Sequence, residues 1–122
     1  MRAMSLLKKH GVTDRSGDGR FFEVYPAASL RAWAMTSRGY KEAKKPECVD
    51  ARQRILVALR TAMPWLVAPD DYAKDADALD SLVAALTVRS AWQGRTMLPN
   101  PSQKAGAKRE GWIHIPSGLP EP

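Results

Sequence analysis

Cysteine, long apolar runs and internal repeats are scarce or absent in this sequence. The single cysteine, Cys48, excludes a disulfide within the chain and suits a reducing cytoplasm, where we expect the protein to reside. No apolar run approaches membrane-spanning length, and residues 1–10 do not resemble a signal peptide, so we expect no membrane association. No internal repeat is found.

The composition that remains is that of a small basic globular protein. The 122 residues suffice for one domain with a modest core, and 44% of them are hydrophobic. Nineteen Lys and Arg against thirteen Asp and Glu give a net charge of +6. A surplus of this size suits a polyanionic partner, most commonly nucleic acid, although many basic proteins bind no polyanion.

Hydrophobic periodicity and turn residues predict an α/β fold with about two strands and four helices in a single domain, residues 1–122. Residues 95–109 lack periodicity and are rich in Pro, Gly and Lys, so we expect a long, mobile connection there. The tail, residues 117–122, is expected to be frayed. The predicted strands cover residues 20–25 and 110–116, and the predicted helices cover residues 1–9, 27–35, 48–63 and 69–92.

The stretch of residues 75–86 (DADALDSLVAAL) reads as a helix with two distinct faces. Leucine and valine side chains form one apolar stripe, whereas Asp77 and Asp80 lie one turn apart on another face. No residue of this helix neutralises Asp80, and a divalent cation would do so. The alternative is that Asp75 or Asp77 caps the helix and is otherwise solvated. The stripe consists of Leu79, Leu82, Val83 and Leu86.

Three further features carry candidate chemistry. Glu23 is a carboxylate within an apolar predicted strand, although on an edge strand it would merely face water. Lys41, Lys44 and Lys45 can contact phosphates, or they can form a solvated loop. His114 alternates with isoleucines and is expected to be a structural residue more often than a ligand.

Four blocks occur in order: FFEVYPAASLRAW (21–33), RGYK (38–41), DADALDSLVAAL (75–86) and EGWIHIP (110–116). Together they resemble the carboxy-terminal half of the domain of unknown function 429 family, described as a predicted RNase H-like nuclease. The resemblance implies a partial RNase H-like fold and metal-dependent hydrolysis of phosphodiester bonds. It implies that Glu23, Asp77 and Asp80 are catalytic residues and hold Mg²⁺ or Mn²⁺, which prefer oxygen ligands.

The sequence departs from the RNase H-like pattern before Glu23. Such folds begin with strands of which the first carries a metal-binding aspartate, whereas Asp14 and Asp18 lie in a predicted turn. We therefore expect a truncated or split domain that lacks the amino-terminal strands and needs a partner polypeptide or a second copy to complete it. The alternative function is that of a non-catalytic remnant or an interaction module that binds nucleic acid or protein.

Overall fold

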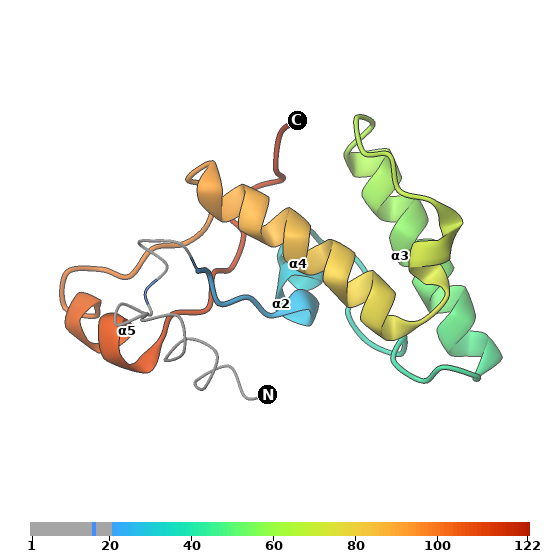
Figure 1. Ribbon diagram of the computed structural model, residues 1–122, viewed down its shortest axis with the longest axis horizontal. Helices are drawn as coiled ribbons and strands as arrows, with labels where there is room; N and C mark the ends of the chain where they lie inside the picture. The colour runs from blue at the N-terminus through green and yellow to red at the C-terminus, as the bar shows by residue number, and fades with distance from the viewer. Residues whose placement is uncertain (1–15, 17–20) are drawn as a thin grey trace.

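The computed structural model describes Ser16 and residues 21–122 and shows an arrangement of helices joined by long extended segments (Figure 1). The predicted helix over residues 1–9 lies outside the described residues. Three of the described helices are those that periodicity predicts, and one is not. The helices are α2 (Pro26–Ala32), α3 (Pro46–Ala62), α4 (Ala76–Trp92) and α5 (Lys104–Glu110), with the 3-10 helix η1 (Asp70–Ala73) before α4.

The predicted α/β fold, a partial RNase H-like fold with about two strands, is wrong for the described residues. These residues are mostly helical and form no sheet. The two predicted strands take part in isolated bridges alone: Glu23 pairs in parallel with Ile113, and Thr96 pairs antiparallel with Pro116. Helix α2 begins at Pro26, which ends the first segment after its single bridge. The second segment has bridges at Ile113 and Pro116 and goes no further, because Pro116 cannot donate to a ladder. Aromatic and β-branched residues form a strand when a neighbouring segment pairs with several of them in succession. These two segments have isolated bridges instead.

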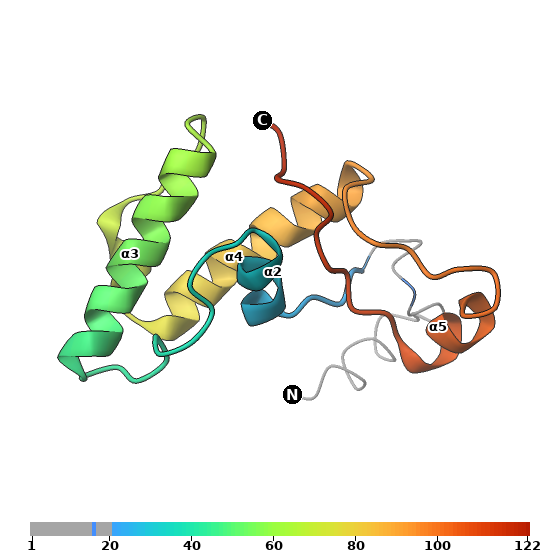
Figure 2. The same ribbon diagram turned by 180° about the vertical axis from the view of Figure 1, so that it is seen from behind.

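The core lies where α4 contacts α2, η1 and α3 (Figures 1 and 2). The predicted apolar stripe of α4 is buried throughout, and so is the inner face of α3. At the crossing of α2 and α4, the hydroxyl groups of Ser29 and Thr87 lie 2.7 Å apart. The stripe of α4 is Leu79, Leu82, Val83 and Leu86, and the inner face of α3 is Ile55, Leu56, Leu59 and Met63.

Residues 104–109 were expected to be part of an irregular connection and Glu110 to begin a strand, and both predictions are wrong, because these residues form α5. The turn before it is closed by two reciprocal hydrogen bonds: Gln103 N donates to Asn100 Oδ1 at 2.9 Å, and Asn100 N donates to Gln103 Oε1 at 3.0 Å. This pattern is that of a capping box. Both views place α5 at the end of the molecule opposite α3 (Figures 1 and 2).

The predicted fraying of the tail is also wrong. The backbone carbonyl of Glu121 accepts hydrogen bonds from Arg89 and from Gln93 of α4, at 2.6 and 2.8 Å. Its carboxylate pairs with Arg95 at 2.7 Å. The last residues therefore run along the carboxy-terminal end of α4.

Candidate functional site

The acidic face of α4 is the part of the predicted site that the structure defines best. Asp75 caps the helix, because its side chain accepts a hydrogen bond from Ala78 N at 2.7 Å. The capping alternative is thus confirmed for Asp75. Asp77 lies exposed in the first turn, where a negative charge suits the helix dipole. Asp80 follows one turn later, with its side chain 21% exposed.

Asp80 is neutralised from a loop far away in the sequence. The buried Tyr40 donates its hydroxyl hydrogen to Asp80 Oδ1 at 2.7 Å. The ammonium group of Lys41 pairs with the other oxygen, Oδ2, and lies 4.9 Å from the centre of the Tyr40 ring. Both carboxylate oxygens therefore have a hydrogen-bond donor. The charge that appeared to require a cation is balanced by the protein itself.

Arg52 of α3 holds the loop that carries Tyr40 and Lys41 in place through hydrogen bonds. Arg52 lies on α3 and is 0% exposed, which is unusual for an arginine. Its guanidinium group donates hydrogen bonds to backbone carbonyls on both sides, and the bonds to Tyr40 and Ala73 are buried. The distances are 2.8 Å to Tyr40, 3.0 Å to Glu42, 3.2 Å to Ala43, 3.0 Å to Ala73 and 3.3 Å to Lys74. Arg52 thereby ties the loop that carries Tyr40 and Lys41 to the segment that leads into α4.

The surroundings of Tyr40 raise the pKa of its hydroxyl group far above the ordinary 10.0. Burial is the largest cause, and the hydrogen bond to Asp80 and its negative charge add to it. The folded protein thus keeps this proton when an unfolded chain would release it. The hydroxyl group of Tyr40 acts as a hydrogen-bond donor at neutral pH and well above it.

This pKa shift predicts a loss of stability in alkali. Above the ordinary pKa of 10.0 the unfolded chain ionises Tyr40 and the folded chain does not, so the free energy of unfolding falls as the pH rises, by at most about 1.4 kcal/mol per unit. Tyr40→Phe should cost about 1–2 kcal/mol at pH 7 through the lost hydrogen bond, and the difference should shrink above pH 10. Urea unfolding across this pH range measures both effects. Parallel pH curves for the two proteins would contradict the assignment.

The three predicted catalytic acids are not gathered into one metal centre within the described residues. Asp77 and Asp80 share α4, whereas Glu23 precedes α2 and lies partly buried beside Ile113, whose bridge it forms. No group of three or more His, Cys, Asp or Glu among Ser16 and residues 21–122 is arranged to hold a metal ion. The Mg²⁺ or Mn²⁺ centre therefore stays a prediction, and the described residues by themselves do not form it.

The three lysines predicted to contact phosphate differ in their surroundings. Lys41 pairs with Asp80, and Lys45 pairs with Glu42 at 3.1 Å. Lys44 is exposed and has no ion-pair partner among the described residues. Both side chains of the Lys45–Glu42 pair are exposed, so the pair stabilises the fold by at most about 1 kcal/mol, and a phosphate can readily replace Glu42.

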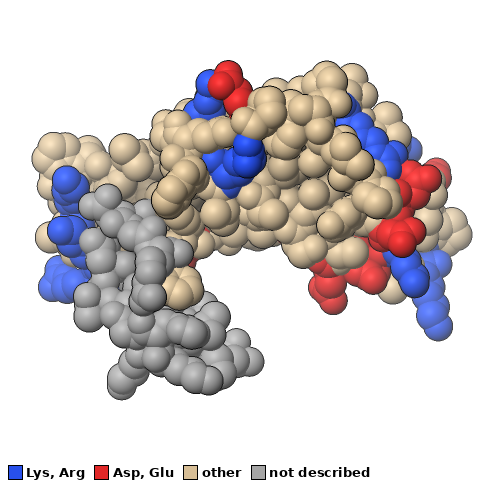
Figure 3. Space-filling model, turned by 45° about the horizontal axis from the view of Figure 1, so that its top comes forward, with Lys and Arg blue, Asp and Glu red and all other residues tan. Residues whose placement is uncertain are grey.

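A second group of cations lies on α5. Lys104, Lys108 and Arg109 are exposed, and none is in an ion pair with a carboxylate of the described part of the chain. Lys104 and Lys108 lie one turn apart and so share a face of the helix, while Glu110 is the one acid of α5. Figure 3 shows Lys and Arg side chains gathered at the end of the molecule where α5 lies.

His114 is a structural residue, as predicted. It is 2% exposed, and its ring packs edge-on against Phe22 with 5.2 Å between ring centres. Nε2 lies 2.9 Å from the carbonyl oxygen of Ser16 and must donate to it, since a carbonyl can only accept. Nδ1 then accepts from the hydroxyl group of Thr96 at 3.0 Å. Both ring nitrogens are thus occupied in joining three distant segments.

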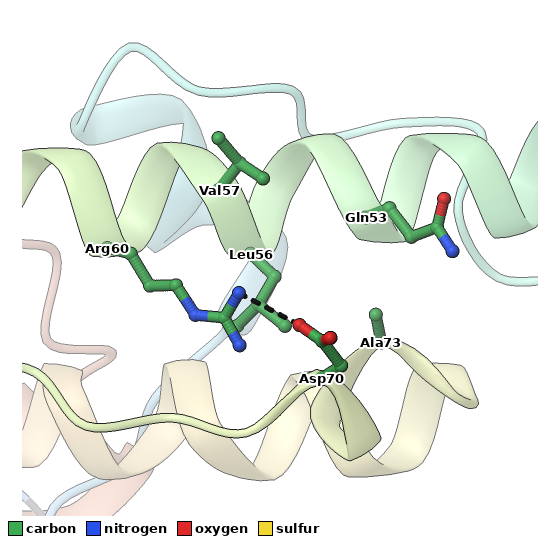
Figure 4. Close-up of a pocket in the computed structure, with 6 residues that line it drawn as sticks. All are labelled: Gln53, Leu56, Val57, Arg60, Asp70 and Ala73. Carbon is green, nitrogen blue, oxygen red and sulfur yellow. Dashed lines mark ion pairs between the residues drawn. The ribbon is translucent and has the colours of Figure 1, made fainter.

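A hollow between α3 and η1 contains none of the predicted site residues (Figure 4). An ion pair between Arg60 and Asp70 spans it at 2.9 Å, and Arg60 also donates to the carbonyl oxygen of Ala68 at 2.8 Å through Nε. Gln53, Leu56 and Val57 of α3 and Ala73 of η1 form the rest of the wall. The hollow therefore presents one closed ion pair, one amide side chain and apolar surface.

Sequence reasoning missed Tyr40 and Arg52. Tyr40 lies inside the RGYK block, directly after Gly39, whose φ of 74° turns the chain at this point. An aromatic residue after such a glycine was the available signal for a buried tyrosine. Arg52 gave no comparable signal. It is one of several arginines along α3, a pattern typical of an exposed helix face.

Comparison with known proteins gives the chain a family. A family model described as "Protein of unknown function (DUF429)" matches residues 1–104. The match includes the loop with Tyr40 and Lys41 and the whole of α4, and it ends at the first residue of α5. No curated protein and no solved structure matches the chain. The chain belongs to the DUF429 family, as its sequence blocks predicted.

Proposed function

We propose that this protein binds the phosphate backbone of nucleic acid through the exposed cations of α5. The observation that carries the proposal is the group of Lys104, Lys108 and Arg109, exposed at one end of the molecule with no carboxylate of the described residues paired to them. Lysine and arginine side chains that lack an acidic partner are free to neutralise phosphates and to release counterions. The net charge of +6 of the whole chain adds long-range attraction for a polyanion.

The arrangement around Asp80 supports binding more than hydrolysis. Tyr40 and Lys41 already satisfy both oxygens of Asp80, and the pair anchors the loop that runs into α3. A carboxylate bound in this way has a structural role. Lys44 and Lys45, in the same loop and at the opposite end of the molecule from α5, remain a predicted second point of phosphate contact.

The proposal predicts a large effect of neutralising α5. Lys104→Gln, Lys108→Gln and Arg109→Gln together should weaken binding of a labelled oligonucleotide of about 20 nucleotides by about tenfold or more in about 50 mM salt. The slope of log affinity against log salt should fall by about 2–3, since up to three phosphate contacts disappear. Fluorescence anisotropy at about 50 and 200 mM salt measures both quantities.

A matched control separates position from net charge. Arg31, Arg54 and Lys74 are exposed cations without an ion pair among the described residues and lie on or beside other helices. Replacing these three with glutamine changes the net charge equally and should leave most of the affinity in place. Equal losses in the two triple variants, or no measurable binding by the unaltered chain, would overturn the proposal.

Metal-dependent hydrolysis of phosphodiester bonds remains the second predicted function, because Asp77 and Asp80 do lie one turn apart on α4 within the family match. Hydrolysis requires that Asp80 release Lys41, and that Glu23 approach α4. The same oligonucleotides are therefore incubated with the chain and with Mg²⁺ or Mn²⁺. Cleavage that Asp80→Asn abolishes would replace the binding proposal. A missing-half polypeptide or a second copy stays a predicted partner, and light scattering tests the latter.

A further inference from the structure

Large apolar side chains are exposed on both sides of α5 in the chain. Met97 and Leu98, just before the helix, are 51% and 71% exposed, and Ile113, just after it, is 51% exposed. The two segments run side by side, because Met97 N donates to the carbonyl oxygen of Ile115 at 2.9 Å. The exposed apolar residues therefore lie on neighbouring backbone segments that enter and leave the cationic helix.

Trp112 is fixed between these segments. Its indole N–H donates to the carbonyl oxygen of Met97 at 2.8 Å, and the residue is only partly buried. This hydrogen bond ties the ring to the neighbouring segment and restricts its rotation. An aromatic ring held in this way loses little conformational freedom when a flat ligand stacks on it.

Unpaired cations next to a fixed aromatic ring and exposed apolar side chains are the combination that binds single-stranded nucleic acid. The cations follow the backbone, and the bases, which a duplex hides in its interior, stack on the ring or pack against apolar side chains. A duplex offers the same phosphates without accessible base faces. Charge complementarity therefore selects a polyanion for this surface, and the partly buried aromatic ring and the exposed apolar side chains select one with free bases.

We propose that the α5 surface takes single-stranded nucleic acid, with phosphates on Lys104, Lys108 and Arg109 and bases against Trp112, Met97 and Leu98. This inference rests on the function proposed above and specifies its ligand. Three of the six residues, Lys108, Arg109 and Trp112, lie beyond residue 104, where the family match ends.

The test compares one labelled oligonucleotide as a single strand and as a duplex with its complement, using the full chain. We expect the single strand to bind about tenfold more tightly at equal salt. Met97→Gln with Leu98→Gln, and separately Trp112→Leu, should weaken single-strand binding by about fivefold to tenfold with an unchanged salt slope. Duplex binding should change little in either variant.

Exposed apolar residues elsewhere supply the control. Val57 and Val67 are 57% and 93% exposed, and changing both to glutamine should leave single-strand affinity unaltered. The Met97 and Leu98 variant has its changes at exposed positions, so it tests the inference even where Trp112→Leu impairs folding.

Each outcome separates the two proposals. Equal affinity for single strand and duplex would overturn this inference and leave backbone binding standing, whereas no binding to either would overturn both. Displacement of the strand by polyglutamate as effectively as by unlabelled strand would show an acidic-polypeptide site and overturn this inference as well.

Discussion

Replacing Arg52 with methionine should lower the free energy of unfolding by about 3 kcal/mol or more, since it removes five hydrogen bonds to backbone carbonyls, of which those to Tyr40 and Ala73 are buried. The guanidinium group is 0% exposed and donates to five carbonyls from two separate segments. Methionine fills a similar volume but donates nothing. Urea denaturation monitored by circular dichroism measures the change.

The loss should extend to the loop that Arg52 supports. Because Tyr40 and Ala43 carbonyls lose their donor, amide hydrogens of the loop should exchange faster in Arg52→Met, and so should those near Ala73. Arg52→Lys keeps the charge and offers three donors from a single point, so it should restore part of the stability.

Arg54 provides the comparison for Arg52. It lies on the same helix, two residues further along, and is exposed. Arg54→Met should change stability by no more than about 0.5 kcal/mol. If Arg52→Met lowers the free energy of unfolding as little as Arg54→Met does, water can replace the guanidinium group. The structural role proposed for Arg52 would then be wrong.

The second large effect concerns the contact of α3 with its neighbours. Leu59 is 0% exposed and belongs to the main hydrophobic cluster. Leu59→Ala should cost about 2–5 kcal/mol, the sum of lost apolar burial and of the cavity left behind. A protein of this size has about 5–15 kcal/mol of stability, so the variant should unfold at a markedly lower temperature.

Val57 is the matched position for Leu59. It lies on the opposite side of the same helix and is 57% exposed. Val57→Ala should be close to neutral, since alanine has the higher helix propensity and little buried surface is lost. Thermal unfolding of both variants under identical conditions tests the pair, and similar losses at the two positions would mean that α3 does not pack as described.

Helix prediction succeeded where burial repeats with the helical period. The stripe of α4 and the inner face of α3 place leucine, isoleucine and valine at spacings of three and four residues, and those residues are buried. Prolines 26 and 46 begin α2 and α3, where a missing N–H costs nothing. These are local properties, so the sequence reveals them directly.

Strand prediction failed because a strand is defined by its partners. The predicted strands, residues 20–25 and 110–116, have suitable composition, yet the first forms one isolated bridge and the second two. The second segment is otherwise held by contacts such as those of His114 with Thr96 and Phe22. The reverse error occurred at α5, where a glycine and flanking prolines obscured a short helix. The Asn100 and Gln103 pair was the local signal for the turn that precedes it.

The sequence by itself determined the family, the helices with a periodic apolar face, and a surplus of positive charge. Tertiary structure alone decided which charges have partners: Asp80 meets Tyr40 and Lys41, Arg52 turns inward to backbone carbonyls, and the cations of α5 stay exposed. The physical reason is range. Periodicity is a property of residues a few positions apart, whereas the partner of a charge is set by segments that meet only when the chain has folded.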